Sequence, residues 1–178
     1  MQSEQKQSEE KQSGQPLSSP TPDELTVWRV FLETSYALID ILDDELQAEG
    51  EMNLRWYDVL VNLEEAEHPV RMNELAARIL ASKSGLTRVI DRMEDAGLVE
   101  RRRPPDDRRA IEVVITDRGA EALHAARLVH RRGIYEHFSQ HLDDDHFAAL
   151  RAALAGVHDH VRPLRPGRVT GSPRGPLS

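Results

Sequence analysis

The chain contains no cysteine, and only 4 % of its 178 residues are aromatic. The absence of cysteine excludes a disulfide framework, a thiolate nucleophile, a cysteine-built zinc site and a cysteine-oxidation switch. No apolar run reaches the roughly 18 residues that a membrane-crossing helix needs, and the polar N-terminus lacks the apolar middle of a signal peptide. We therefore expect a cytoplasmic protein with an aliphatic core and no membrane partner.

The sequence also lacks the motifs of common catalytic sites. It has no glycine-rich phosphate loop, no nucleophile elbow and no complete triad or metal-ligand set. We therefore expect no enzyme, no catalytic residue, no cofactor and no metal site. Eight histidines are present, and His130, His137 and His141 are predicted to share one helix face, where a pair at i, i+4 can ligate zinc. Because no carboxylate or thiolate completes that set, solvated or interfacial histidine is the favoured interpretation.

Positive charge is scarce in most of the chain and concentrated in one segment. The net charge is −8, yet residues 82 to 109 hold eight cations and six anions, so this segment is +2 and the remainder is −10. A protein with an acidic body and a cationic edge would bind DNA through that edge, because the DNA phosphates attract the cations and repel the rest of the surface. It would not bind DNA nonspecifically with its whole surface.

The two ends of the chain are almost free of apolar residues, so residues 1–20 and 163–178 are predicted to be disordered. Between them, apolar spacing and capping residues predict helices over about 21–47, 53–65, 72–79, 82–95, 117–140 and 143–162, with strands over 98–103 and 110–116. Thr21-Pro22-Asp23-Glu24 is a capping box with proline at the first helical position. The first helix is apolar on more than one face, which requires two partners: its own core and a second subunit.

A short helix, a turn, a longer helix and a β-hairpin follow one another, which is the order of a winged helix-turn-helix. In the longer helix, apolar residues at i, i+3, i+4 and i+7 face the core; they are Leu86, Val89, Ile90 and Met93. The opposite face carries Ser84, Arg88, Asp91 and Asp95, flanked by Thr87 and Arg92. A recognition helix enters the major groove through its N-terminal residues, which here are small, polar and cationic.

The stretch "MNELAARILASKSGLTRVIDRMEDAGLVERRRPPDDRRAIEVVITDRG" resembles the MarR family of bacterial transcriptional regulators, and the resemblance covers about residues 25 to 162. Its most specific part is the wing: Asp107-Arg108-Arg109, then an alternating strand and Ile115-Thr116-Asp117-Arg118-Gly119, with Ile where the family usually has Leu. One departure is Arg71-Met72-Asn73, where a hydroxyl cap would be expected before the short helix.

The resemblance implies a mainly α fold with a small β-hairpin wing. One domain is expected over 21–162, with the winged helix-turn-helix at about 53–116 and dimerisation helices at about 21–47 and 117–162. The implied function is a ligand-responsive repressor that binds a palindromic double-stranded DNA site as a homodimer. The alternative is a winged-helix interaction module that has lost DNA binding.

The resemblance also assigns site residues. Arg109 would enter the minor groove at the wing tip, Asp107 would orient it, and Arg108 would contact phosphate. The recognition-helix set comprises Ser82, Lys83, Ser84, Thr87 and Arg88. The resemblance implies a small-molecule effector, and the aromatic residues Trp28, Tyr36 and Trp56 are our own candidates for its pocket; plain core residues are the alternative interpretation of these three.

Overall fold

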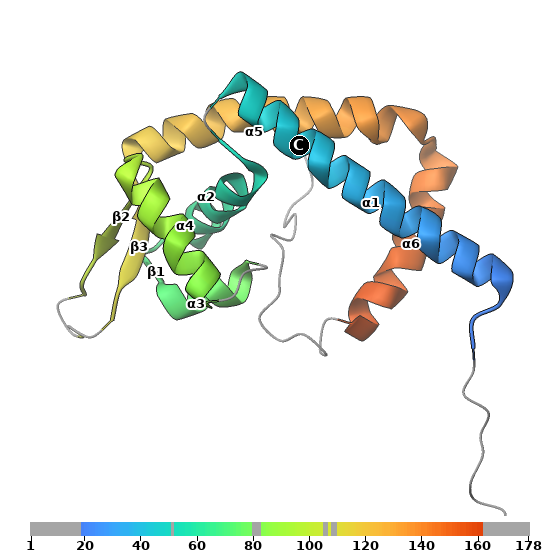
Figure 1. Cartoon of the computed structure of the whole chain (residues 1–178), viewed down its shortest axis with the longest axis horizontal. Coiled ribbons are helices and arrows are strands. Elements are labelled where there is room, and N and C mark those ends of the chain that lie inside the picture. The colour runs from blue at the N-terminus through green and yellow to red at the C-terminus, as the bar shows by residue number, and fades with distance from the viewer. Residues whose placement is uncertain (1–18, 51, 80–82, 105–106, 108–109, 162–178) are drawn as a thin grey trace, which may run out of the picture. The chain divides into compact units, whose positions relative to one another are not determined.

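The computed structural model describes residues 19–50, 52–79, 83–104, 107 and 110–161. The predicted disordered tails lie outside these residues, apart from Ser19 and Pro20, and the domain limits of 21–162 remain a prediction. The elements are α1 (Pro22–Glu49), α2 (Leu54–Ala66), β1 (Val70–Arg71), α3 (Met72–Arg78), α4 (Lys83–Asp95), β2 (Val99–Arg102), β3 (Glu112–Ile115), α5 (Asp117–His137), the 3-10 helix η1 (Ser139–His141) and α6 (Asp144–Val161) (Figure 1). This confirms the predicted fold class, mainly helical with a small antiparallel sheet.

The first helix begins at the predicted capping box. The Glu24 amide donates to Thr21 Oγ1 at 3.2 Å, and the Thr21 amide donates to the Glu24 carboxylate at 2.7 Å. The hydrogen bond from the Thr21 amide to the Glu24 carboxylate lowers the pKa of Glu24. The chain divides into two compact units within α1, between Tyr36 and Ala37, and each unit is described by itself.

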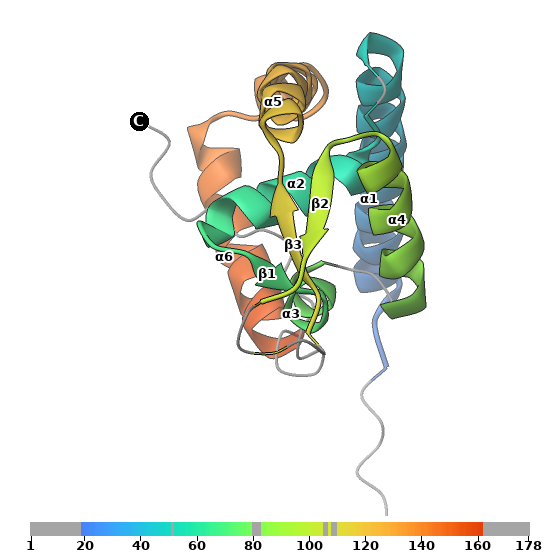
Figure 2. The ribbon, with the colours of Figure 1, turned by 90° about the vertical axis from the view of Figure 1, so that its left-hand side faces the viewer.

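The sheet of the second unit has the order β1-β3-β2, with both pairs antiparallel (Figure 2). Strand β1 was not predicted, because two residues are too short to show a period of two. In this strand Val70 pairs with Val113. Just after the strand, the Met72 amide donates to the Ile111 carbonyl at 3.1 Å. This bond sets the start of α3, whose N-cap residue Arg71 provides no side-chain cap.

The predicted alternation of the second wing strand is only partly correct. Ile111, Val113 and Ile115 are the apolar positions of this alternation and were expected to face the core; Val113 is fully buried, but Ile111 is 41 % exposed. The reason is that the ladder begins at Glu112, so the alternation of a pleated strand does not constrain the side chain before it.

The core of the second unit lies between α2, α3, α4, α5 and the sheet. Its largest fully buried side chains are Leu46, Leu60, Leu75, Leu86, Ile90, Met93 and Leu123. All four residues of α4 predicted to face inward are buried, and so are Leu75 of α3 and Ile79, its C-cap residue. The orientation of α4 predicted from its sequence is therefore confirmed.

The wing lies between the end of α4 and the start of α5, and both of these helix ends are capped. Gly97 has φ +72°, its amide donates to Glu94, and the Leu98 amide donates to Met93, which is the Schellman ending of α4. Thr116 caps α5: its hydroxyl accepts from the Gly119 amide at 3.0 Å and donates to the Gly97 carbonyl at 2.7 Å. One threonine thus joins the end of α4 to the start of α5.

The fifth helix ends at His137, earlier than the predicted Gln140. Phe138 leaves the helical region (φ −133°, ψ −62°), and the chain continues as η1. The prediction that His130, His137 and His141 share one helix face is therefore wrong. His130 packs against Tyr57 with ring centroids 4.5 Å apart, His137 pairs with Glu45, and His141 lies in η1 beside the Glu136 carbonyl.

The half-buried ring of His130 makes stability depend on pH. Burial lowers the pKa of His130, so below the ordinary value of about 6.5 the unfolded chain takes up a proton more readily than the folded chain. The free energy of unfolding should therefore fall as the pH is lowered from about 7 to about 5. Urea denaturation should show a smaller fall in His130→Gln. The matched control is His124→Gln, an exposed histidine on the same helix; equal falls in both variants would contradict this role of His130.

Candidate nucleic-acid interface

The outward face of α4 carries five of the residues that the sequence assigned to it. Thr87, Arg88, Asp91, Arg92 and Asp95 are all exposed, and Lys83 and Ser84 form the first turn of the helix. Ser82, Arg108 and Arg109 lie outside the described residues, so their roles stay predictions.

An arginine of the wing ties β2 to α4. Arg101 donates to Asp91 and to Glu94, each at 2.5 Å, and its own amide donates to Glu94 at 2.9 Å. Partial burial opposes the charge of Arg101, but the hydrogen bonds and charges of Asp91 and Glu94 outweigh it and raise the pKa of the guanidinium. Arg101 therefore offsets the acidic residue in the middle of the outward face.

The three consecutive wing arginines have different surroundings. Arg101 is 22 % exposed and is held by α4, Arg102 pairs with Glu100, and Arg103 is exposed. The sequence analysis missed the first contact because Arg101 and Asp91 are ten residues apart, beyond the spacing that helix or strand periodicity reports.

Two hollows flank α4. One, of about 660 Å³, is lined by Thr87 and Arg101 together with the start of α3 and the wing. The other, of about 470 Å³, gathers three arginines on the opposite flank: Arg55, Arg88 and Arg92. Arg55, in the first turn of α2, was not predicted as a site residue. It was missed because it is distant in sequence from the basic segment.

The base of the wing tip is closed by a turn. The Ala110 amide donates to the Asp107 carbonyl at 3.0 Å, and the Asp107 carboxylate lies 3.6 Å from Arg71. Asp107 is thus linked to the residue that joins β1 to α3. Its predicted support of Arg109 falls on a residue outside the described part of the chain and stays a prediction.

The three residues predicted for an effector pocket lie in different surroundings. Trp56 lines a pocket of about 250 Å³ with apolar walls that include Leu46 and Leu98, beside Glu49 and Arg118. Trp28 and Tyr36 belong to the first unit, where they are 56 % and 64 % exposed. Trp28 packs against Phe31, and the roles of Trp28 and Tyr36, in an effector pocket or in a core, stay predictions.

A polar helix face beside a cationic hollow, next to a β-wing, defines a winged helix-turn-helix protein. The model of the MarR family matches residues 51–110. The structure is similar to AbsC, a MarR family transcriptional regulator from Streptomyces coelicolor, with a TM-score of 0.75, 33 % identity and coverage of 82 % of this chain and 99 % of that one. The chain belongs to the MarR family of transcriptional regulators.

Two other relatives agree with this assignment. Sco3205 from Streptomyces coelicolor, a MarR family regulator solved in complex with DNA, has a TM-score of 0.75 and 29 % identity, covering 86 % of this chain and 98 % of that one. The transcriptional repressor MprA of Escherichia coli K12 is 30 % identical over 101 residues, which are 56 % of this chain and 57 % of that protein. The match thus spans just over half of the length of MprA. Within the residues that the structure describes, every helix is too short or too polar to span a lipid bilayer.

Proposed function

We propose that this protein is a sequence-specific double-stranded DNA-binding regulator that represses transcription from a palindromic site as a homodimer. The observation that carries the proposal is the outward face of α4, where Thr87 and Arg88 are exposed and Asp91 is offset by Arg101. Such a face can approach phosphates without net repulsion at its centre. The DNA complex of Sco3205 is a property of that relative, and it supports the same use of the fold here.

In this proposal α4 enters the major groove and the wing reaches the backbone and the minor groove. Ser82, Lys83, Ser84, Thr87 and Arg88 contact phosphates and base edges. Arg109 enters the minor groove, and Arg108 contacts phosphate. The cationic hollow with Arg55 adds a phosphate contact from α2.

The homodimer is supported by large apolar side chains that one chain leaves exposed. In the first unit they are Leu25, Val27, Trp28, Phe31 and Tyr36, and on α6 they are Leu154, Val157 and Val161. Large apolar side chains left exposed on a helix are typical of surfaces that a protein partner covers. A two-fold dimer would place its recognition helices about one turn of DNA apart, roughly 34 Å.

We propose as part of the same function that a small-molecule effector binds the protein and changes its affinity for DNA. Of the three predicted pocket residues, Trp56 lines a described pocket, whereas the exposed faces of Trp28 and Tyr36 suit a subunit interface. The similar proteins named above are regulators, and we propose that this chain likewise has no enzymatic activity.

The test is binding to the DNA upstream of the protein's own coding sequence, measured by gel shift at several salt concentrations. We expect Arg88→Ala and Arg109→Ala each to weaken binding by about 10- to 100-fold, since each loses a contact to a groove or phosphate. The matched control is Arg151→Ala, an exposed arginine on α6, which should bind as the wild type does. Unchanged affinity in both site variants would refute the assigned interface.

The acidic body and the exposed Asp95 on α4 favour the alternative, an interaction module that does not bind DNA. The same gel shift separates the two functions. Binding that weakens steeply as salt rises shows release of counterions from phosphates, whereas no shift at low salt would select the interaction module.

A further inference from the structure

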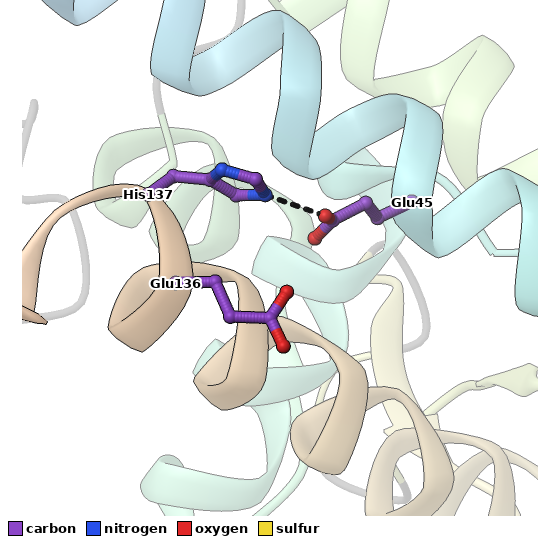
Figure 3. A group of neighbouring side chains, drawn as sticks. All are labelled: Glu45, Glu136 and His137. Carbon is purple, nitrogen blue, oxygen red and sulfur yellow. Dashed lines mark hydrogen bonds and ion pairs between the residues drawn. The ribbon is translucent and has the colours of Figure 1, made fainter.

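Three potential metal ligands from two helices meet in the second unit. Glu45 of α1 and the neighbouring Glu136 and His137 of α5 place one ligand atom each within 4.8 Å of one another (Figure 3). Local sequence pairs His137 only with its neighbour Glu136, because Glu45 precedes His137 by 92 residues.

The Glu45 carboxylate is only half satisfied. One of its oxygens lies 2.7 Å from His137 Nε2, but the other, Oε2, is buried and has no hydrogen-bond partner among the described residues. A buried carboxylate oxygen without a partner is costly, because it has lost its water. A cation beside it would supply the missing interaction.

A glycine makes the space for this carboxylate. Gly133, one turn before His137, is buried, and a Cβ there would collide with Glu45 Oε2 and lie 2.6 Å from Leu42 Cδ2. A larger residue at position 133 would displace the ends of the Glu45 and Leu42 side chains. The close approach of the two helices is what brings Glu45 to the two α5 ligands.

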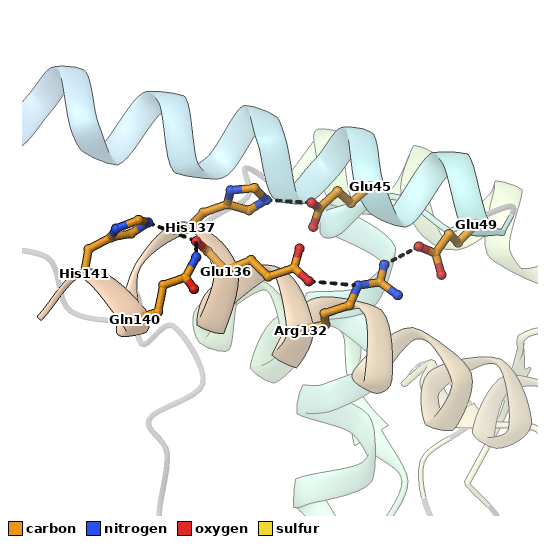
Figure 4. A network of polar contacts seen from close by, with 7 residues as sticks. All are labelled: Glu45, Glu49, Arg132, Glu136, His137, Gln140 and His141. Carbon is orange, nitrogen blue, oxygen red and sulfur yellow. Dashed lines mark hydrogen bonds and ion pairs between the residues drawn. The ribbon is translucent and has the colours of Figure 1, made fainter.

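The third ligand is available to move inward. The Glu136 carboxylate forms only a long ion pair with Arg132, 4.0 Å from its Nε, because Arg132 also pairs with Glu49 (Figure 4). Gln140 and His141 contact the Glu136 backbone carbonyl and leave its carboxylate untouched. The Glu45 and Glu136 carboxylates thus add negative charge beside an imidazole.

We propose that Glu45, Glu136 and His137 form a binding site for one divalent first-row transition-metal ion of the zinc class. Imidazole nitrogen and carboxylate oxygen bind such ions at about 2.0–2.2 Å, which places tetrahedral ligand atoms about 3.3–3.6 Å apart. His137 and Glu45 need to separate slightly, and Glu136 needs to turn inward. Three protein ligands leave the fourth position to water. Mg²⁺ and Ca²⁺ prefer all-oxygen sites and fit this set poorly.

The ion would link the second half of α1 to the end of α5. Metal binding itself does not depend on the proposed function; an effect of the ion on operator binding does. The first experiment therefore measures binding alone, so that a failure of the metal site and a failure of the regulator are distinguishable.

The test titrates the full chain with Co²⁺, whose visible absorption is intense in tetrahedral sites, and with Zn²⁺ by calorimetry. We expect one ion per chain and no comparable binding of Mg²⁺. Glu45→Gln and His137→Gln should each weaken binding by about tenfold or more, as happens even when a supporting group of a metal site is lost. Glu136→Gln, at an exposed position, provides a ligand variant that leaves the α1–α5 packing intact.

The matched control is His146→Gln, because His146 also lies 2.7 Å from a carboxylate, that of Asp143, but is not part of a described three-ligand group. It should bind the ions as the wild type does. The proposal is overturned by unchanged affinity in Glu136→Gln and His137→Gln, by an equal loss in His146→Gln, or by no Co²⁺ or Zn²⁺ binding to the wild-type chain.

Discussion

Gly119→Ala is expected to destabilise the fold by about 3 kcal/mol, which lowers the melting temperature of a chain of this size by about 6–12 °C. A Cβ at this position would fall well inside the van der Waals distance of the Leu98 carbonyl oxygen and lie 2.9 Å from Ile115 Cγ1. The Leu98 carbonyl oxygen belongs to the backbone, so it cannot rotate away as a side-chain atom could. The start of α5 would have to move off the wing, and the Thr116 cap would be strained with it.

The control is Gly156→Ala on α6, where a Cβ would meet no atom within 4 Å. Because alanine favours a helix interior over glycine, this variant should be about 0.5–1 kcal/mol more stable than the wild type if the helix is otherwise unchanged. Chemical denaturation of both variants measures the difference. Gly119→Ala within about 0.5 kcal/mol of the wild type would contradict the close packing of α5 on β2.

Arg101→Ala is expected to weaken operator binding by about tenfold, although the side chain is directed to α4 and not to DNA. Removing the guanidinium leaves Asp91 uncompensated on the face proposed to approach phosphate. It also releases the contact between α4 and β2 through Glu94. Fluorescence anisotropy with a labelled operator measures the loss, and a thermal melt shows how much of it comes from stability.

A double variant separates this indirect role from a direct phosphate contact. If Arg101 acts by offsetting Asp91, then Arg101→Ala combined with Asp91→Asn should bind more tightly than Arg101→Ala alone. If Arg101 itself contacts phosphate, the second substitution should not restore what the first removed. The coupling between the two positions therefore decides the role of this wing arginine.

Local patterns determined much of this fold. The capping box at Thr21 was predicted from residues within a few positions of one another, and it forms. The Schellman glycine at position 97 and the Thr116 cap are equally local features. The inward face of α4 followed from helical periodicity for the same reason. Short-range steric and hydrogen-bonding rules act on neighbouring residues, so they can be recognised in a single sequence.

The errors have an equally physical origin. Strand β1 has only two residues, so its hydrogen bonds to β3 come from tertiary pairing and not from a propensity of its own. The end of α5 at His137 depends on the backbone of Phe138, and a helical pattern continuing past this residue gave no sign of it.

By itself, the sequence determined the helical class, the recognition face and the family motifs, because these depend on composition, periodicity and adjacent residues. Only the tertiary structure decided which distant groups meet: Arg101 with Asp91 across the wing, Arg55 with Arg88 beside α4, and Glu45 with His137 between α1 and α5. The last of these depends on how closely α1 approaches α5, which the small size of Gly133 permits and which no local pattern reports.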